Sequence, residues 1–308
     1  MAWEDAMHIT RRSLLGGLAA APLILPGRAR ALATFEADGI RLDLVSDGNL
    51  VLPRELVFAP VPQAVAKDVA SRFGLGESLA PDCTLTLYRD GTNVVLFDAG
   101  SGPAFQPTAG QMLDDLSGLG VDPADVTHLV LTHAHPDHLW GVVDDFEEPL
   151  FPNAVHLIGR VEHDYWRDPA TVETIGAERQ AFAVGASRRL EQVADLLETF
   201  EDGEEVAEGI TARLTPGHTP GHMSFDLTFS GEPLTVIGDA VANHHVALAH
   251  PMQETGQDQD PPLAARTRTA LLDDLADSGA RVVGFHFPHP GMGRIVREGE
   301  GFAFAPEA

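Results

Sequence analysis

Four side chains that can bind metal ions lie within six residues near the middle of the sequence: His133, His135, Asp137 and His138. They follow directly after the apolar run His128–Thr132, so a buried strand would hold them at the edge of a sheet. Imidazole and carboxylate groups without a thiolate suit Zn²⁺, Mn²⁺, Co²⁺ or Fe. The spacing therefore predicts a metal centre in which the first two histidines face one point and the last two side chains a neighbouring one.

Three later side chains are placed to complete this centre. His218 lies in a turn locked by glycine and proline between two strand-like runs. Asp239 and His286 each come at the end of a further apolar, strand-like run. Ligands at the ends of several strands converge on one edge of a sheet in α/β proteins, so we expect these three side chains to join the cluster.

The elements that must position these side chains are mostly short strands. Runs with strand-like composition, mostly bounded by turn residues, are Ile40–Ser46, Cys83–Arg89, Asn93–Phe97, His128–Thr132, Ala154–Ile158, Ile210–Thr215, His222–Thr228, Leu234–Ile237 and Arg281–Phe285. Helical periodicity occurs at Pro62–Phe73, Gly110–Leu119, Glu178–Thr199 and Pro261–Ser278, and Val246–Pro262 is predicted to be a long ordered loop. This order predicts an α/β fold with two mixed β-sheets packed face to face and helices on the outer faces.

The composition is that of a globular protein with an acidic surface. Hydrophobic residues make up 44% and charged residues 21% of the chain, and the formal net charge is -26. Such a field repels phosphate backbones, which argues against nucleic acid as a partner. Cys83 is the only cysteine, which excludes an internal disulfide and a cysteine-rich metal site.

Residues 1–33 are predicted to be a twin-arginine signal peptide. Arg11 and Arg12 precede an apolar run that ends near Leu25, and Ala31–Ala33 offers a cleavage site of small residues. The apolar run has about half of the ~20 residues that a membrane-spanning helix needs, and no later stretch is apolar enough to span a membrane. We therefore expect residues 34–308 to form one domain that is periplasmic or secreted.

The complete pattern resembles the metallo-β-lactamase superfamily. It consists of His-x-His-x-Asp-His, then Gly-His, then Gly-Asp and a late His, and it runs over most of residues 34–308. The stretches Asp43–Leu52, Phe151–Ala154 and Phe287–Pro306 look most like the group that contains methyl parathion hydrolase and the N-acyl homoserine lactonases. The resemblance implies the αββα sandwich of that superfamily and, by analogy, a homodimer.

The resemblance also implies a centre of two divalent metal ions, most simply Zn²⁺. The implied ligands are His133, His135 and His218 for the first ion, Asp137, His138 and His286 for the second, and Asp239 as a bridge. A hydroxide between the ions would attack a carbonyl or phosphoryl centre. Asp137 or Asp239 would carry a proton to the leaving group. The implied activity is hydrolysis of a small ester-like substrate, which is a lactone, a carboxylic ester or an organophosphate triester.

Other residues near the ligands have assigned or open roles. Asp98 follows a strand and matches the acid that accepts the free N–H of a ligand histidine in this family. His222 is interpreted as structural, because the first histidine of its turn already completes the set for the first ion. Trp140 and Phe287 lie within two residues of a ligand, and each either lines the substrate pocket or packs in the core.

Two further histidines, His245 and His289, follow the bridging acid and the last ligand. Each lies either at the rim of the pocket or on the solvated surface. The lactonases of this group place a tyrosine three residues after the bridging acid, where this chain has Ala242. Aromatic residues make up only 6% of the chain, which weakens the case for a pocket that binds an aryl leaving group.

Two other functions stay open at the level of the sequence. One is a mononuclear iron persulfide dioxygenase of the same superfamily, which uses fewer of the ligands. The presence of His138, His286 and Asp239 together favours two ions over one. The other is a non-catalytic exported binding protein, against which the intact set of ligands argues.

Overall fold

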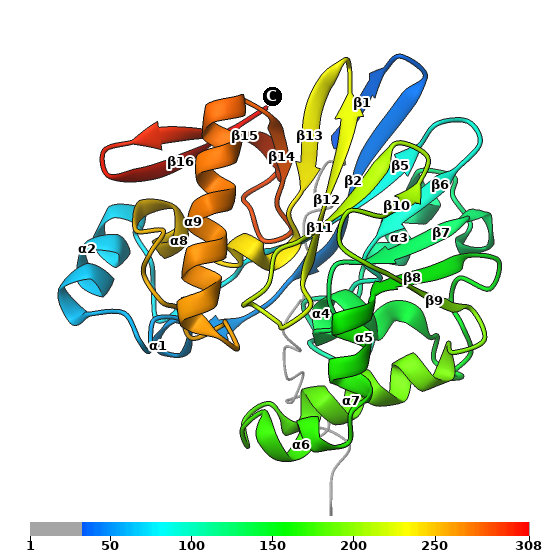
Figure 1. Cartoon of the computed structure of the whole chain (residues 1–308), viewed down its shortest axis with the longest axis horizontal. Coiled ribbons are helices and arrows are strands. Elements are labelled where there is room, and N and C mark those ends of the chain that lie inside the picture. The colour runs from blue at the N-terminus through cyan, green and yellow to red at the C-terminus, as the bar shows by residue number, and fades with distance from the viewer. Residues whose placement is uncertain (1–32, 308) are drawn as a thin grey trace, which may run out of the picture. The chain divides into compact units, whose positions relative to one another are not determined.

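The computed structural model describes residues 33–307 of the chain. The predicted signal peptide lies outside these residues, apart from its last residue, Ala33. Two mixed seven-stranded sheets form the centre of the described region (Figure 1). Each sheet combines antiparallel hairpins with parallel neighbours: the parallel pairs join residues 94–97, 128–131, 155–159 and 197–200 in the first sheet and residues 232–236 and 281–283 in the second.

Hydrogen bonding between neighbours sets the spatial order of the strands in each sheet. The first sheet runs through β1 (Ala33–Ala37), β2 (Ile40–Asn49), β5 (Asp82–Arg89), β6 (Val94–Phe97), β7 (His128–Leu131), β8 (Val155–Gly159) and β9 (Leu197–Phe200). The second runs through β10 (Glu205–Ala207), β11 (Ile210–Leu214), β12 (Met223–Phe229), β13 (Glu232–Val236), β14 (Arg281–Val283), β15 (Met292–Glu298) and β16 (Gly301–Pro306). The short strands β3 (Leu52–Pro53) and β4 (Ser78–Leu79) pair separately.

The α-helices of the described region are α1 (Arg54–Val57), α2 (Gln63–Phe73), α3 (Met112–Gly118), α4 (Pro136–Leu139), α5 (Arg160–Arg167), α6 (Ala170–Thr174), α7 (Gln180–Gln192), α8 (Val246–Ala249) and α9 (Pro261–Ser278). Short 3-10 turns occur at Pro123–Asp125, Trp140–Val142 and Gly238–Val241. Within this region, no helix combines the length and the apolar character needed to cross a membrane.

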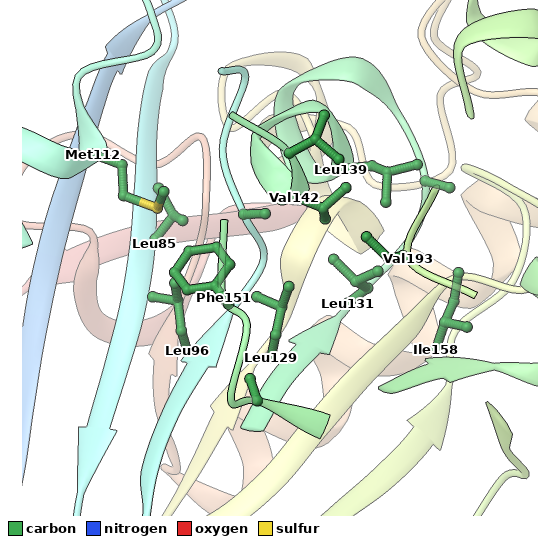
Figure 2. Close-up of a cluster of buried hydrophobic side chains, with 14 of the residues drawn as sticks. Leu85, Leu96, Met112, Leu129, Leu131, Leu139, Val142, Phe151, Ile158 and Val193 are labelled. Atoms are coloured by element: carbon green, nitrogen blue, oxygen red, sulfur yellow. The ribbon is translucent and has the colours of Figure 1, made fainter. Parts of the chain in front are cut away.

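The alternation of side chains along β7 shows why apolar contacts form on both faces of the first sheet. Leu129 and Leu131 point into the core between the first sheet and its helices, where Figure 2 shows them together with Leu139 and Val142. Val130 points to the opposite face and packs between the two sheets. Because both faces of this strand are covered, its apolar residues are consecutive.

A third core lies between the second sheet and α9. Helix α9 lies over the strands of this sheet (Figure 1). Its Leu271 and Leu272 pack with Val282 and Ile295 of the strands. The helix has the predicted bounds, because the Asp260 side chain accepts a hydrogen bond at its start and a left-handed glycine follows its end. Helices therefore cover both outer faces, and the predicted αββα sandwich is confirmed.

One predicted helix is too long. The periodicity of Glu178–Thr199 predicts a single helix, but α7 ends at Gln192 and Leu197–Phe200 form β9. The edge of the first sheet explains the difference, because β9 pairs in parallel with β8 and gives its backbone groups partners there. The β15–β16 hairpin is also absent from the predicted elements.

The contribution to stability of the core between the first sheet and its helices can be tested with two leucines of α3. Leu116 is fully buried, whereas Leu113 is 45% exposed. Leu116→Ala is expected to lower the free energy of unfolding by about 2–5 kcal/mol, because it removes buried methyl groups and leaves a cavity. Leu113→Ala should change it by no more than about 0.5 kcal/mol. Denaturant unfolding of both variants measures the change in the free energy of unfolding. Equal effects of the two substitutions would contradict the assignment of Leu116 to this core.

Candidate metal centre

The predicted ligands come from four segments that meet at one edge of the two sheets. The segment after β7 and the first turn of α4 carry four of them, the turn between β11 and β12 carries His218, and the ends of β13 and β14 carry Asp239 and His286. Because β13 and β14 are parallel neighbours, their carboxyl ends lie at the same edge. The structure thus brings all seven predicted ligands together.

The first ligand set consists of His133, His135 and His218. His135 Nδ1 lies 3.0 Å from His133 Nε2 and 2.9 Å from His218 Nε2. A tetrahedral zinc ion with bonds of roughly 2.0–2.1 Å to imidazole separates its ligand atoms by about 3.3 Å. The two separations are slightly shorter than this value, and all three nitrogens lie within 4.8 Å of one another, so they can surround one ion.

The second ligand set consists of Asp137, His138 and His286. Asp137 Oδ2 lies 3.6 Å from His138 Nε2 and 3.2 Å from His286 Nε2. Asp239 lies between the two sets: its Oδ2 is 3.2 Å from His218 Nε2 of the first set, and its Oδ1 is 3.5 Å from His138 Nε2 of the second. The carboxylate of Asp239 can therefore contact an ion in either set.

Three polar atoms at this point are buried without a hydrogen bond to the described residues. They are Asp137 Oδ2, His138 Nε2 and Asp239 Oδ1. Leaving a buried polar atom unpaired costs free energy, and it costs more when the group is charged. His138 Nε2 lies 3.6 Å from Asp137 Oδ2 and 3.5 Å from Asp239 Oδ1, so divalent metal ions fit this donor set.

The charges around the second set explain the shifts in its pKa values. Burial disfavours the charged form of His138, but the carboxylates of Asp98, Asp137 and Asp239 raise its pKa to about 10. Burial likewise opposes ionisation of Asp239, yet the surrounding imidazoles hold its pKa well below the usual range. In the metal-free protein, protons on the imidazoles balance the carboxylates, and a cation would replace them.

In the first ligand set, burial and the neighbouring charges affect the histidine pKa values differently. Burial, together with neighbouring imidazoles, holds the pKa of His133 and His135 well below the usual value. Burial opposes the charging of His218 as well, but Asp239 and Asp258 raise its pKa to about 9. Two of the three imidazoles are therefore neutral and already in the form that binds a metal ion.

Asp98 lies where the sequence predicted an acid beside a ligand histidine. His138 Nδ1 donates to its Oδ2 at 2.8 Å, and the backbone N–H of Thr132 donates to its Oδ1 at 2.8 Å. His286 is oriented in a comparable way, since its Nδ1 donates to the backbone oxygen of Asp82 at 2.7 Å. Both histidines therefore present Nε2 to the second set.

Asp258 performs the same task for His218, and no sequence pattern pointed to it. It lies in the predicted long loop, 40 residues from His218, and its Oδ1 accepts from His218 Nδ1 at 3.1 Å. Its Oδ2 accepts from Thr255 Oγ1 at 2.9 Å and from the buried guanidinium of Arg268 at 3.3 Å. Only the tertiary fold brings this polar loop under the ligand.

The contacts of His222 support its interpretation as a structural residue. Its Nε2 accepts the backbone N–H of Asp239 at 2.9 Å, and its Nδ1 lies 2.8 Å from Thr215 Oγ1. Burial lowers its pKa to about 3, so the ring is neutral. The preceding Gly238 has φ +48° and a Cβ there would meet His222 Nε2 at 2.7 Å, so glycine is required for this approach.

Cys83 lies beside the second set as a buried thiol. Its sulfur is within 4.8 Å of ligand atoms of Asp137 and His286. Burial raises the pKa of this thiol to about 12, so it stays protonated at neutral pH.

The four predicted pocket residues have different surroundings. Phe287 is fully buried and packs on Phe304 in the core beneath α9, so it lines no pocket. Trp140 is partly buried under the Arg189 guanidinium and beside Phe105.

The two histidines of that group also differ. His245 is half-buried, stacks on His244 and meets Phe73 of α2 edge-on. His289 is exposed.

Aromatic side chains beside the first set went unpredicted. The ring of Phe182 on α7 lies 6.1 Å from the ring of His135 and 6.0 Å from that of Phe105, measured between centroids. Trp166 of α5 lies 5.8 Å from His135 on the same measure. Phe105 and Phe182 are both half-buried, so they form an apolar wall next to a ligand.

Comparison with protein families agrees with this geometry. The model described as "Metallo-beta-lactamase superfamily" matches residues 81–286, which include every predicted ligand. The chain belongs to the metallo-β-lactamase superfamily. The superfamily resemblance seen in the sequence is therefore confirmed.

Individual relatives support the same grouping. N-acyl homoserine lactonase AttM from Agrobacterium fabrum is 33% identical over 132 residues, which are 42% of this chain and 46% of the relative. AttM from Azorhizobium caulinodans is 33% identical over 135 residues, which are 42% of this chain and 47% of the relative. The chain thus matches about half the length of these curated relatives.

Two solved structures share the fold over nearly their full length. AidC, described as a dizinc quorum-quenching lactonase in complex with a product, has a TM-score of 0.84 at 24% identity, covering 90% of this chain and 98% of AidC. AbOPH, described as a hydrolase in the beta lactamase superfamily, has a TM-score of 0.84 at 26% identity, covering 91% and 99%.

Binding of divalent ions is expected to release protons. The carboxylates around them raise the pKa of His138 to about 10 and that of His218 to about 9, so both rings carry a proton in the metal-free protein at neutral pH. Because a histidine binds metal in its neutral form, affinity should fall as the pH is lowered. Adding zinc to the metal-free protein at about pH 7.5 in weak buffer, with a pH indicator, measures the release. An unchanged pH would contradict the arrangement.

Proposed function

We propose that the protein is a binuclear metal-dependent hydrolase that cleaves a small, uncharged ester-like substrate. The observation that carries this proposal is the position of Asp239 between the two ligand sets. Its Oδ2 lies 3.2 Å from His218 Nε2 of the first set and 3.4 Å from His286 Nε2 of the second, and its Oδ1 lies 3.5 Å from His138 Nε2 of the second. The buried atoms of Asp137, His138 and Asp239 that lack hydrogen bonds support it as well. The names of the relatives, lactonase and hydrolase, agree with the reaction type.

Two divalent ions in such a site, most simply Zn²⁺, supply a nucleophile from water at neutral pH and neutralise the charge that develops on the substrate. The chain's part is to hold the ligands and to move a proton. Asp137 and Asp239 present carboxylate oxygens toward the same point from the second set and from the bridge. We assign to one of them the transfer of a proton to the leaving oxygen.

The surroundings of the ligands bear on the class of substrate. Phe105 and Phe182 place an apolar wall beside His135, which suits a substrate with an acyl, alkyl or aryl group. The net charge of -26 disfavours anionic substrates. Lactones, carboxylic esters and phosphate triesters are uncharged and fit both conditions. Ala242 takes the place at which the resembled lactonases have a tyrosine, so a lactone would be held here without that hydroxyl.

His133→Ala tests the role of the first ligand set. It is expected to remove one bound ion and to lower kcat/KM by roughly 1,000-fold, because the electrostatic contribution of a metal ion amounts to several kcal/mol. His163→Ala is the matched control, since His163 lies on α5 and pairs with Asp164 outside the cluster. Activity and metal content measured on both variants decide the matter, and full activity of His133→Ala would refute the proposal.

Elemental mass spectrometry of the purified protein separates this proposal from the alternatives. About two zinc, manganese or cobalt atoms per chain, together with hydrolysis in a panel of lactones, carboxylic esters and phosphate triesters, would support it. A single iron atom with oxygen uptake in the presence of glutathione persulfide would favour the dioxygenase. Absence of metal after reconstitution would favour a binding protein.

A further inference from the structure

Glu162 on α5 is a buried acid that none of the roles above uses. Its side chain has no exposed surface. Oε1 accepts from the backbone N–H of Ala134 at 3.0 Å and from Trp166 Nε1 at 2.6 Å. Oε2 accepts from Thr219 Oγ1 at 2.7 Å and from the backbone N–H of Gly221 at 3.0 Å. Every contact is short enough for a good hydrogen bond.

These four donors suit an ionised carboxylate. Each oxygen of a carboxylate offers about two acceptor positions, so two donors on each oxygen use all of them. A protonated Glu162 could keep all four contacts only by donating its own hydrogen to Thr219 Oγ1, because the other three partners cannot accept. Burial raises the pKa of the Glu162 carboxyl group, and the hydrogen bonds from the donors counteract that rise. None of the four donors is a charged group, so these contacts compensate the negative charge of Glu162 only by neutral hydrogen bonds.

Three of the four donors come from the two segments that carry the first ligand set. Ala134 separates His133 from His135, and Thr219 and Gly221 follow His218 in the next turn. The approach to this turn is very close, because a Cβ on Gly221 would lie 2.1 Å from the backbone nitrogen of Glu162. Glu162 thus fixes the separation between two loops that are 83 residues apart at their ligands, His135 and His218.

Trp166, one helical turn after Glu162, also contacts the first ligand set. It lies four residues after Glu162, so both side chains project from one face of α5. Its indole N–H is held by the carboxylate, and its ring lies edge-on to the ring of His135. One face of α5 therefore contacts every segment of the first set.

The second ligand set is supported elsewhere. Asp98 holds His138, and the backbone oxygen of Asp82 holds His286. These contacts come from the segments around β5 and β6, and Glu162 takes no part in them. A change at Glu162 should therefore act on one half of the centre.

We infer that Glu162 is a positioning residue that assembles the first ligand set and, through its negative charge, favours a cation there. This inference rests on the proposed centre of two ions. Removing a residue that orients metal ligands typically lowers metal affinity by about 10–100-fold. The ion in the second set should be bound with nearly unchanged affinity.

Glu162→Gln tests this inference with a side chain of the same shape. An amide nitrogen would replace one carboxylate oxygen, so that its two N–H donors would face two groups that are themselves donors. Zinc is titrated into the metal-free full-length variant against a competing chelator, and bound zinc is counted by elemental analysis. The expected result is that one of two ions binds about 10–100-fold more weakly. Asp98→Asn should chiefly weaken the ion in the second set, because Asp98 holds His138; through Thr132 it also contacts His133 of the first set.

Asp47→Asn is the control for a general loss of stability. Asp47 is also a buried acid, and it accepts the backbone N–H groups of Ser101, Gly110 and Met112. Its variant should unfold more easily but still bind two ions. Unchanged affinity for both ions in Glu162→Gln, or an equal loss in Asp47→Asn, would overturn the inference.

A second variant keeps the inference testable if Glu162→Gln does not fold. Thr219→Val removes one donor and keeps the carboxylate, and it should weaken the same ion to a smaller extent. Unchanged binding in Thr219→Val would then count against the inference. If the wild-type protein itself binds fewer than two ions, the proposed function fails first, and that result does not depend on any variant.

Discussion

The fold has to bring three carboxylates and several imidazoles together in a buried place. Each buried charge there needs a compensating partner. Asp239 is at the centre of this requirement, because its two oxygens face both ligand sets. Its backbone is fixed by His222, which accepts its N–H, and by the left-handed turn at Gly238. Burying a charge costs several kcal/mol unless partners surround it, so every element around Asp239 has to provide a partner or a ligand.

The sandwich meets this requirement by placing the ends of its buried strands at one edge. β7 and β14 are held on both faces by apolar cores, and β13 packs Leu234 and Val236 between the sheets, which leaves the last residues of these strands little freedom. The loops that follow them begin with a ligand or reach one within a few residues. A rigid scaffold can therefore hold ligands from distant segments at the spacing of a metal ion.

Three buried acids extend this order outward from the ligands. Asp98 orients His138, Asp258 orients His218, and Glu162 joins the loops that carry the first set. Asp98 and Asp258 fix which ring nitrogen faces the centre, and Asp258 also contacts Arg268, which anchors the loop after α8. The arrangement of the centre is thus determined as much by these contacts as by the ligands themselves.

The sequence alone determined the features that depend on neighbouring residues. The cluster from His133 to His138, the apolar runs before each ligand, the bounds of α9 and the order of strands and helices are all local patterns, and they were enough to predict the fold and superfamily, which are confirmed. Tertiary structure decided the rest. Glu162, Asp258 and Phe182 acquire their roles through contacts with residues that are 28 to 59 positions away in the chain. No local pattern records such contacts. The same reason explains why the predicted helix 178–199 ends early and why Phe287 lies in the core: pairing with β8 and packing under α9 depend on partners that are distant in the chain.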